Sequence, residues 1–356
     1  MLLVLHKSAN GNDLDGDGDT GRSRLRHDSG MTGPAEDLIT VIVPAYNAQA
    51  TLDETLHSVC AQTHRALEVI VADDGSTDTT AEIVAHHARA DPRVRLLRQA
   101  NTGVAAARNA AIAAARGEFI APIDADDLWH PAKLEKQLAA MRRGGERVGL
   151  VYVWSAFIDL DSRIVGLMEQ NFDEGLVLAR LCHGNFVGNG SAPLMRSAAV
   201  RQAGGYDTSL LRREAEGCED FALYLAIAEH YEYVLVPEYL TGYRQRPDSM
   251  SSDSPQMCRS FDLVTSALMA RRPDLRFHLQ NGKANSLLGT YRRLKAAGDG
   301  ERARPYLLRF VWAMPYHAVK AFLYRPIRNA FLHSLTGRSS ATQQSAWIGR
   351  RFPHFT

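Results

Sequence analysis

Three aspartates end the apolar run "FIAPIDADD" at residues 119–127, and no basic residue accompanies them. In an extended strand, residues two apart face the same side, so we expect Asp124 and Asp126 to point together and Asp127 to turn into the following loop. Paired carboxylates attract a hard divalent ion such as Mg²⁺ or Mn²⁺, which takes further ligands from water and substrate phosphate. The pattern predicts a metal site at Asp124 and Asp126. The alternative is a solvated acid cluster ahead of a helix that begins at Pro131.

A second acidic pair, Asp73 and Asp74, lies in "VADDGSTD" at residues 71–78. A carboxylate here can accept hydrogen bonds from a nucleobase N–H or a ribose hydroxyl. The residues that follow suit a tight turn and a helix cap. Ligand binding is the favoured interpretation of the aspartates, and turn chemistry alone is the alternative.

The stretch "ANTGVAAARNAA" at residues 100–111 contains neither a GxGxxG pattern nor a Walker lysine. A dinucleotide fingerprint and a P-loop are therefore excluded. Gly103, at the start of an Ala-rich helix, and Arg108 can still contact a diphosphate through helix amides and a guanidinium. The alternative for Arg108 is an ordinary surface position.

Glu219 and Asp220 open an apolar helix in "CEDF". Either carboxylate, when ionised, can take a proton from an acceptor hydroxyl as a general base. The helix dipole also favours anions at this position, which is a purely structural explanation.

The elements that must position these residues alternate strictly. Strands are expected at 38–47, 67–76, 94–99 and 118–127, and helices at 50–62, 77–90 and 103–116. This order predicts an α/β fold with a mostly parallel sheet and helices on both faces. Such sheets bind ligands at the carboxyl ends of their strands, where the acidic residues lie.

The remaining chain is expected to follow the same sheet and then turn helical. A strand pair is predicted at 148–159, a glycine-rich loop at 185–207, a helix at 218–230 and strands at 231–245. We therefore divide the chain into a disordered segment (1–37), a catalytic domain (38–255, with halves 38–127 and 128–255) and a basic helical region (256–356). The half calcium-hand pattern at 13–18 lacks flanking helices and is interpreted as solvated linker.

Composition limits the classes of protein to which this chain can belong. The 356 residues are 45% hydrophobic with a formal net charge of +1, so no nucleic-acid partner is expected. Four scattered cysteines without CxxC spacing argue against a zinc site and a disulfide framework. No signal peptide or spanning segment is evident, so a cytoplasmic location is expected.

Taken together, "VIVPAYN", "VIVADDGSTD", "NTGVAAARN", "FIAPIDADD" and "CEDF" resemble the family 2 glycosyltransferases of the GT-A fold. The similarity covers roughly residues 38–250. It implies an inverting enzyme that uses a nucleotide-diphospho-sugar, with a UDP-sugar the leading choice, and Mn²⁺ or Mg²⁺. A glycan or glycolipid acceptor in surface polysaccharide biosynthesis is implied as well.

The resemblance also implies residue roles on the donor side. Pro44, Ala45 and Tyr46 would line the nucleoside pocket. Asp73 or Asp74 would bind the base.

Further roles concern the metal and the acceptor. Asp124 would reach the ribose, and Asp126 would bind the metal that bridges the diphosphate. Asp220, with Glu219 as the alternative, would activate the acceptor hydroxyl.

Several features limit the resemblance. The QxxRW signature of processive members is missing, which favours addition of one or a few sugars. A sugar-phosphate nucleotidyltransferase and a non-catalytic nucleotide-sugar-binding protein remain as alternatives. The aromatic, basic tail at 303–335 suggests that region 300–356 contacts an anionic membrane surface, with proline-broken helices packed on the domain as the rival.

Overall fold

The computed structural model describes residues 37–246, 249, 252–313, 315 and 347–352. The chain divides into the units 1–35 and 36–356, and the architecture below is that of the second. The predicted disordered segment, apart from Asp37, and the half calcium-hand pattern lie outside the described residues. So does most of the tail beyond Ala313.

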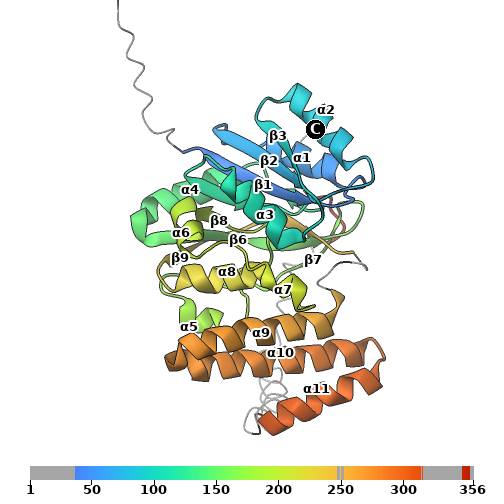
Figure 1. Cartoon of the computed structure of the whole chain (residues 1–356), viewed down its shortest axis with the longest axis vertical. Helices are drawn as coiled ribbons and strands as arrows, with labels where there is room; N and C mark the ends of the chain where they lie inside the picture. Colours follow the sequence, from blue (N-terminus) through green and yellow to red (C-terminus); the bar gives the residue numbers. More distant parts are fainter. Residues whose placement is uncertain (1–36, 247–248, 250–251, 314, 316–346, 353–356) are drawn as a thin grey trace, which may run out of the picture. The chain divides into compact units, whose positions relative to one another are not determined.

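One mixed sheet of nine strands organises the fold, in the order β3-β2-β1-β4-β8-β6-β9-β5, with β7 beside β6 (Figure 1). The strands are β1 (Ile39–Ala45), β2 (Leu67–Asp73), β3 (Val94–Arg98), β4 (Phe119–Pro122), β5 (Leu128–Trp129), β6 (Val148–Ile158), β7 (Ile164–Leu167), β8 (Leu194–Arg196) and β9 (Glu232–Arg244). The first four pair in parallel, as the alternating pattern predicts. β8 pairs antiparallel with both β4 and β6, so the second half of the sheet is mixed.

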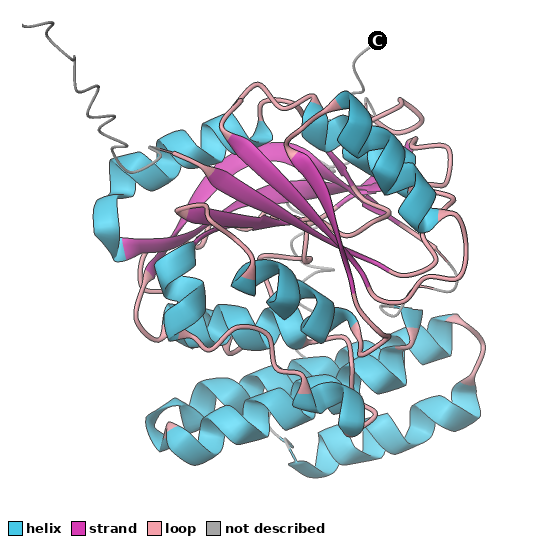
Figure 2. Ribbon diagram, turned by 45° about the horizontal axis from the view of Figure 1, so that its top comes forward, coloured by secondary structure: helices cyan, strands magenta, loops and turns pink. Residues whose placement is uncertain are grey.

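Helices cover both faces of this sheet (Figure 2). They are α1 (Leu52–Cys60), α2 (Thr80–Ala90), α3 (Val104–Ala113), α4 (Lys133–Gly144), α5 (Leu178–Leu181), α6 (Ser197–Gln202), α7 (Ser209–Arg212) and α8 (Glu219–Ala228), with single 3₁₀ turns at Gly145–Arg147 and Pro273–Leu275. Every residue of β1 and β2 is buried, which explains why both strands are mostly apolar. Two polar exceptions pair with each other, because the Thr40 hydroxyl donates a 2.6 Å hydrogen bond to the Glu68 carboxylate.

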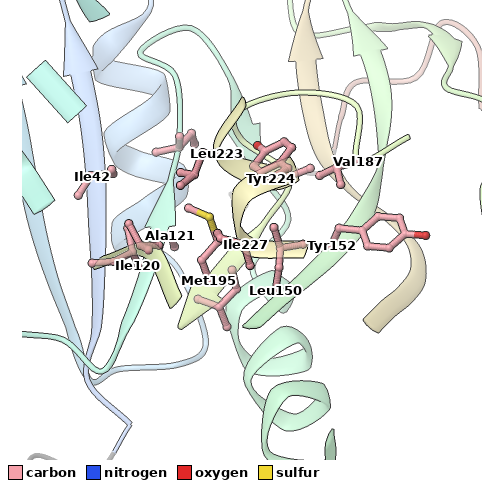
Figure 3. Packing of buried hydrophobic residues seen from close by; sticks show 14 of the residues in the cluster. Ile42, Ile120, Ala121, Leu150, Tyr152, Val187, Met195, Leu223, Tyr224 and Ile227 are labelled. Carbon is pink, nitrogen blue, oxygen red and sulfur yellow. The ribbon is translucent and has the colours of Figure 1, made fainter. Parts of the chain in front are cut away.

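The core extends from the central strands to α8 (Figure 3). Ile42 of β1 and Ile120 of β4 belong to it, together with Leu223 and Tyr224 of α8. The Tyr224 hydroxyl also donates a hydrogen bond of 3.0 Å to the carbonyl of Asn189. The same helix that completes the core thus fixes a glycine-rich loop beside the carboxyl end of the sheet.

Three long helices follow: α9 (Ser254–Arg271), α10 (Arg276–Ala296) and α11 (Gly300–Ala313), which lie side by side in Figure 1. Phe261 of α9 stacks on Phe221 of α8 with ring centroids 5.1 Å apart, and α9 and α10 both contribute to the core of the domain. Phe310 of α11 packs with Ala284 and Leu288 of α10 in a separate cluster. Pro305 lies inside α11 and does not break it, contrary to the sequence expectation. Among the described residues, no helix is both long and apolar enough to cross a bilayer.

Three local expectations are corrected. β4 ends at Pro122, five residues before the predicted end of that strand. α4 begins at Lys133, so Pro131 precedes the helix and is not its first residue. The stretch at 185–207 contains β8 as well as loop and helix, because this short strand fills the space between β4 and β6.

Candidate active site

A cavity of about 810 Å³ opens where the carboxyl ends of β1 and β4 meet the start of α8. Its walls combine four acids, four arginines and aromatic side chains. Members of the predicted site that line it are Pro44, Tyr46, Arg108, Asp124, Asp126, Glu219 and Asp220. Seven of the eleven predicted site residues therefore gather in one place.

The three aspartates lie in a turn rather than in a strand. The turn is closed by a hydrogen bond of 3.1 Å from the Asp127 N–H to the Asp124 carbonyl. The predicted reason for Asp124 and Asp126 facing one side, strand alternation, is therefore wrong. Both nevertheless line the cavity, because the turn itself is directed at it.

Asp127 has a different role from its two neighbours. It is fully buried, accepts a 2.5 Å hydrogen bond from the Ser191 hydroxyl, and accepts one of 2.9 Å from the Arg244 N–H. Burial, followed by the charge of Asp126, raises its pKa well above the usual range. Asp127 joins the turn to β9 and to the glycine-rich loop, and the expectation that it turns into a loop towards the next helix is wrong.

Asp124 is held by Arg108. Its carboxylate forms a short ion pair with the guanidinium, which is only 6% exposed and lies over the Tyr206 ring at 5.1 Å. The Ser191 hydroxyl accepts a hydrogen bond of 3.0 Å from the Asp124 N–H. The alternative of an ordinary surface position for Arg108 is excluded, because this side chain is buried in the cavity wall.

Asp126 is the acid of the turn that the chain leaves most available. The nearest ion-pair partner of its carboxylate is Arg246, at 3.9 Å. Burial, with the charge of Asp124 as the second cause, raises the pKa of Asp126 to about 6. A carboxylate destabilised by burial and by a neighbouring anion is one that a bound cation would stabilise in its ionised form.

The two acids of α8 are separated by their hydrogen bonds. Glu219 is 4% exposed, and its carboxylate oxygens accept from the Gly217 N–H at 2.9 and 3.1 Å. Asp220 is partly buried, and burial raises its pKa to about 7 against the opposing influence of Arg108. Glu219 therefore fixes the loop ahead of α8, while Asp220 has a pKa suited to proton transfer near neutral pH.

The end of β1 and the loop that follows it also contribute to the wall. Pro44 and Tyr46 line the cavity, and Tyr46 is 54% exposed. Ala45 is the last residue of β1 and is buried in the core, so it does not line the cavity.

The carboxylates of Asp73 and Asp74, at the end of β2, are bound by neighbouring backbone and side-chain groups of the chain itself. Asp73 accepts from the Ser76 N–H at 2.9 Å and forms an ion pair with Arg98 at 3.0 Å. Asp74 accepts from the Gly103 N–H at 2.8 Å, and further bonds from the same loop occupy its other oxygen. These residues stabilise the loops at the edge of the cavity without lining it. Base recognition by Asp73 or Asp74 stays a prediction.

Gly103 is also required by its surroundings. It has φ +91°, and a Cβ atom there would lie 2.8 Å from Cδ2 of Leu211. It sets the start of α3 and thereby the position of Arg108 one turn later.

Several wall residues were not singled out from the sequence. Gly190 is one, because a Cβ atom there would lie 3.0 Å from the Arg108 guanidinium and 3.3 Å from the Asp124 carboxylate. Others come from the C-terminal part of the chain: Arg246, Met257, Phe261, Asn285, Ser286 and Arg293. The glycine-rich composition of 185–190 signalled Gly190, whereas the residues of α9 and α10 had no local signal because these helices reach the cavity through tertiary packing.

The chain is similar in sequence to known proteins. Residues 40–201 match the family model described as glycosyl transferase family 2. The match includes Arg108 and the turn of residues 124–127, called the acid turn below, and it stops before Asp220. A curated relative, the putative teichuronic acid biosynthesis glycosyltransferase TuaG of Bacillus subtilis, is 43% identical over 105 residues. That alignment covers 29% of this chain and 42% of TuaG.

Two solved structures share the fold. S. aureus TarS 1–349 in complex with UDP superposes with a TM-score of 0.56 at 18% identity, over 79% of this chain and 82% of that one. The mannosyltransferase PcManGT from Pyrobaculum calidifontis, in complex with GDP-Man and Mn²⁺, gives 0.51 at 19% identity, over 85% and 88%. At these identities the likeness is one of fold.

Proposed function

Residues 40–201 form a glycosyltransferase family 2 domain, and from this premise we propose that the chain moves a sugar from a nucleotide-diphospho-sugar to an acceptor hydroxyl, with inversion at the anomeric carbon. The observation that carries the proposal is one cavity lined by both the Asp124–Asp126 turn and Asp220. A family 2 domain with the GT-A fold makes the chain a glycosyltransferase. The donor, the metal and the stereochemistry are the proposed part.

The residues present suit a divalent ion carried with the donor. Asp126 would hold it, since its carboxylate is partly exposed and has its closest ion-pair partner 3.9 Å away. Asp124 is bound to Arg108 and is better placed for a ribose hydroxyl than as the main ligand. Mn²⁺ or Mg²⁺ would stabilise the charge that develops on the departing diphosphate.

Asp220 is the proposed general base. Its pKa of about 7 leaves a large ionised fraction at neutral pH while keeping enough basicity to take a proton from a sugar hydroxyl. Glu219 is less suited to this role because two bonds from one backbone N–H already occupy its carboxylate. Arg108, next to both Asp124 and Asp220 in the wall, would keep the two carboxylates ionised and oriented.

The acceptor is proposed to be a glycan or glycolipid of a surface polysaccharide. The name of TuaG supports this class, although less than half of TuaG is aligned. The proposed catalytic domain remains 38–255, and α9 and α10 complete its acceptor side because they line the cavity. No specific observation favours a sugar-phosphate nucleotidyltransferase or a non-catalytic binding protein.

The donor can be identified by a thermal-shift screen of UDP-, GDP- and dTDP-sugars with Mn²⁺, with and without a chelator. We expect one nucleotide class, with UDP the leading choice, to raise the Tm in the presence of Mn²⁺ and much less after chelation. A chain that no nucleotide-sugar stabilises under either condition, and that hydrolyses none of them, would contradict the proposal.

Membrane contact through region 300–356 is a separate part of the proposal, with a location on the cytoplasmic face of the membrane. We expect the full chain to float with vesicles that contain anionic lipid and not with neutral ones. Replacing Lys320, Arg325 and Arg328 by Gln should reduce flotation several-fold. Equal flotation of the substituted chain, or none of the wild type, would end the membrane proposal without affecting the enzymatic one.

A further inference from the structure

Two adjacent helices, α1 and α2, carry a histidine and aspartate cluster outside the cavity (Figure 1). Asp53 and His57 lie four residues apart on α1, and His87 lies on α2. Each residue offers one ligand atom, and these atoms lie within 4.8 Å of one another.

The separations suit a shared metal ion. Nε2 of His87 lies 2.9 Å from Oδ1 of Asp53, and the centroids of the His57 and His87 rings lie 4.8 Å apart. With metal–ligand bonds of about 2.0–2.2 Å, neighbouring ligands of a tetrahedral ion are about 3.3 Å apart. Small rotamer adjustments of the two exposed side chains would therefore complete the coordination.

The burial of the three residues also fits such a site. The His87 side chain is 8% exposed, so its ring is fixed by packing, while Asp53 and His57 are 60% and 68% exposed. Nδ1 of His57 lies 2.8 Å from the Asp53 carbonyl, and a proton donated there leaves the lone pair on Nε2. A ring N–H bound to a backbone carbonyl is the usual support of a metal-binding histidine. The exposed side leaves room for water as a fourth ligand.

The ligand types decide which ion fits. Two imidazoles and one carboxylate favour Zn²⁺ and its neighbours in the transition series, whereas carboxylates and phosphate oxygens favour Mg²⁺ or Mn²⁺. The chain therefore presents two sites of different chemistry. One is the acid turn in the cavity, and the other is the cluster between α1 and α2.

We propose that Asp53, His57 and His87 bind a divalent transition-metal ion of the Zn²⁺ class that joins α1 to α2. Joining α1 to α2 would affect the acid turn, because α1 contacts that turn directly. Thr51, just before α1, and Thr55 within it both donate hydrogen bonds to the carbonyl of Ala125, at 2.9 and 3.1 Å. A metal that fixes α1 therefore stabilises an element in direct contact with the donor side of the cavity.

The test is a calorimetric titration of Zn²⁺ into the full, untagged chain, stripped of metal and free of nucleotide. We expect about one equivalent to bind in the wild type, with at least tenfold weaker binding in Asp53→Ala and in His57→Ala. Both replaced side chains are largely exposed, so the fold should survive; equal melting of the metal-free variants checks this. His86→Ala is the matched control, because it removes the adjacent exposed histidine of α2 and should leave binding within twofold.

Co²⁺ in place of Zn²⁺ supplies a second readout. The wild type should show the strong visible absorption of a four-coordinate ion, and His57→Ala should lose it. Asp126→Ala should change neither result, which distinguishes this site from the acid turn. Zn²⁺ binding within threefold of wild type in both Asp53→Ala and His57→Ala, or an equal loss in His86→Ala, would overturn the proposal.

Discussion

Asp220 is the residue whose surroundings bear most directly on catalysis. Replacing it by Asn keeps its size but removes the group that accepts the proton, so we predict at least a hundredfold lower kcat with an unchanged circular dichroism spectrum. Initial rates of sugar transfer measure the effect. Glu219→Gln is the control, and it should lose less than tenfold in kcat. Near-normal transfer by Asp220→Asn would remove Asp220 from the mechanism.

The raised pKa of Asp220 adds a pH signature to that prediction. A general base works when ionised, and the ionised fraction of this carboxyl group rises with pH through about 7. The kcat/KM should therefore increase from pH 5.5 through about 7, where half of the maximum is reached, and level off about one pH unit higher, since kcat/KM reports the free enzyme. The Asp220→Asn variant should lack this inflection in its residual activity.

All four acids that line the cavity were candidates on the basis of the sequence. Asp124 and Asp126 were selected because carboxylates without local cations suggested a metal ion, and Asp220 because an acid at the start of a helix can act as a general base. All three line one cavity. Asp126 was separated from Asp127 by strand alternation in the sequence. The actual basis of the distinction could not be predicted, because it depends on Ser191 and Arg244, which are distant in the chain.

At the scale of elements, the acid turn is held in place by Asp127. Removing its carboxylate in Asp127→Ala leaves the buried Ser191 hydroxyl and Arg244 N–H without an acceptor, which should cost about 2 kcal/mol or more of unfolding free energy. Urea unfolding followed by fluorescence measures this loss. Asp126→Ala should stay within about 0.5 kcal/mol of wild type, because its carboxylate makes no comparable buried bond. Equal stability of the two variants would contradict the division of roles.

The first four strands and three helices were predictable because each combines an apolar run or period with local turn residues. The end of β4 and the insertion of β8 were not. β8 has three residues and pairs with strands far away in sequence, at Ile120 and Leu150, so no local pattern marks it. The position of α10 along the cavity was not predictable either, because it depends on tertiary packing alone.

At the scale of the whole molecule, the end of the described chain returns to the sheet. Phe352 is 1% exposed and packs with Leu128, Ile158 and Ile164, next to the acid turn. The Phe352 N–H donates a 2.8 Å hydrogen bond to the Ser162 carbonyl. Residues 256–356 were described from the sequence as a basic helical region, and a single phenylalanine within a basic stretch gives no sign of its distant partners.

Phe352→Ala should therefore destabilise the whole domain, by about 3 kcal/mol or more, through lost burial and the cavity left behind. Thermal and urea unfolding measure it. Phe277→Ala is the control, since Phe277 is 67% exposed on α10 and should change stability by about 0.5 kcal/mol or less. If Phe352→Ala were as stable as the wild type, the chain end would not contribute to the stability of the domain.

The central claim is that the acid turn binds a nucleotide diphosphate together with a divalent ion through Asp126. Calorimetric titration of UDP into the wild type and Asp126→Ala, each with Mn²⁺ and with chelator, tests it most directly. We predict that Mn²⁺ lowers the Kd of the wild type for UDP at least tenfold and that of Asp126→Ala less than twofold. Equal strengthening by Mn²⁺ in both proteins would contradict the claim.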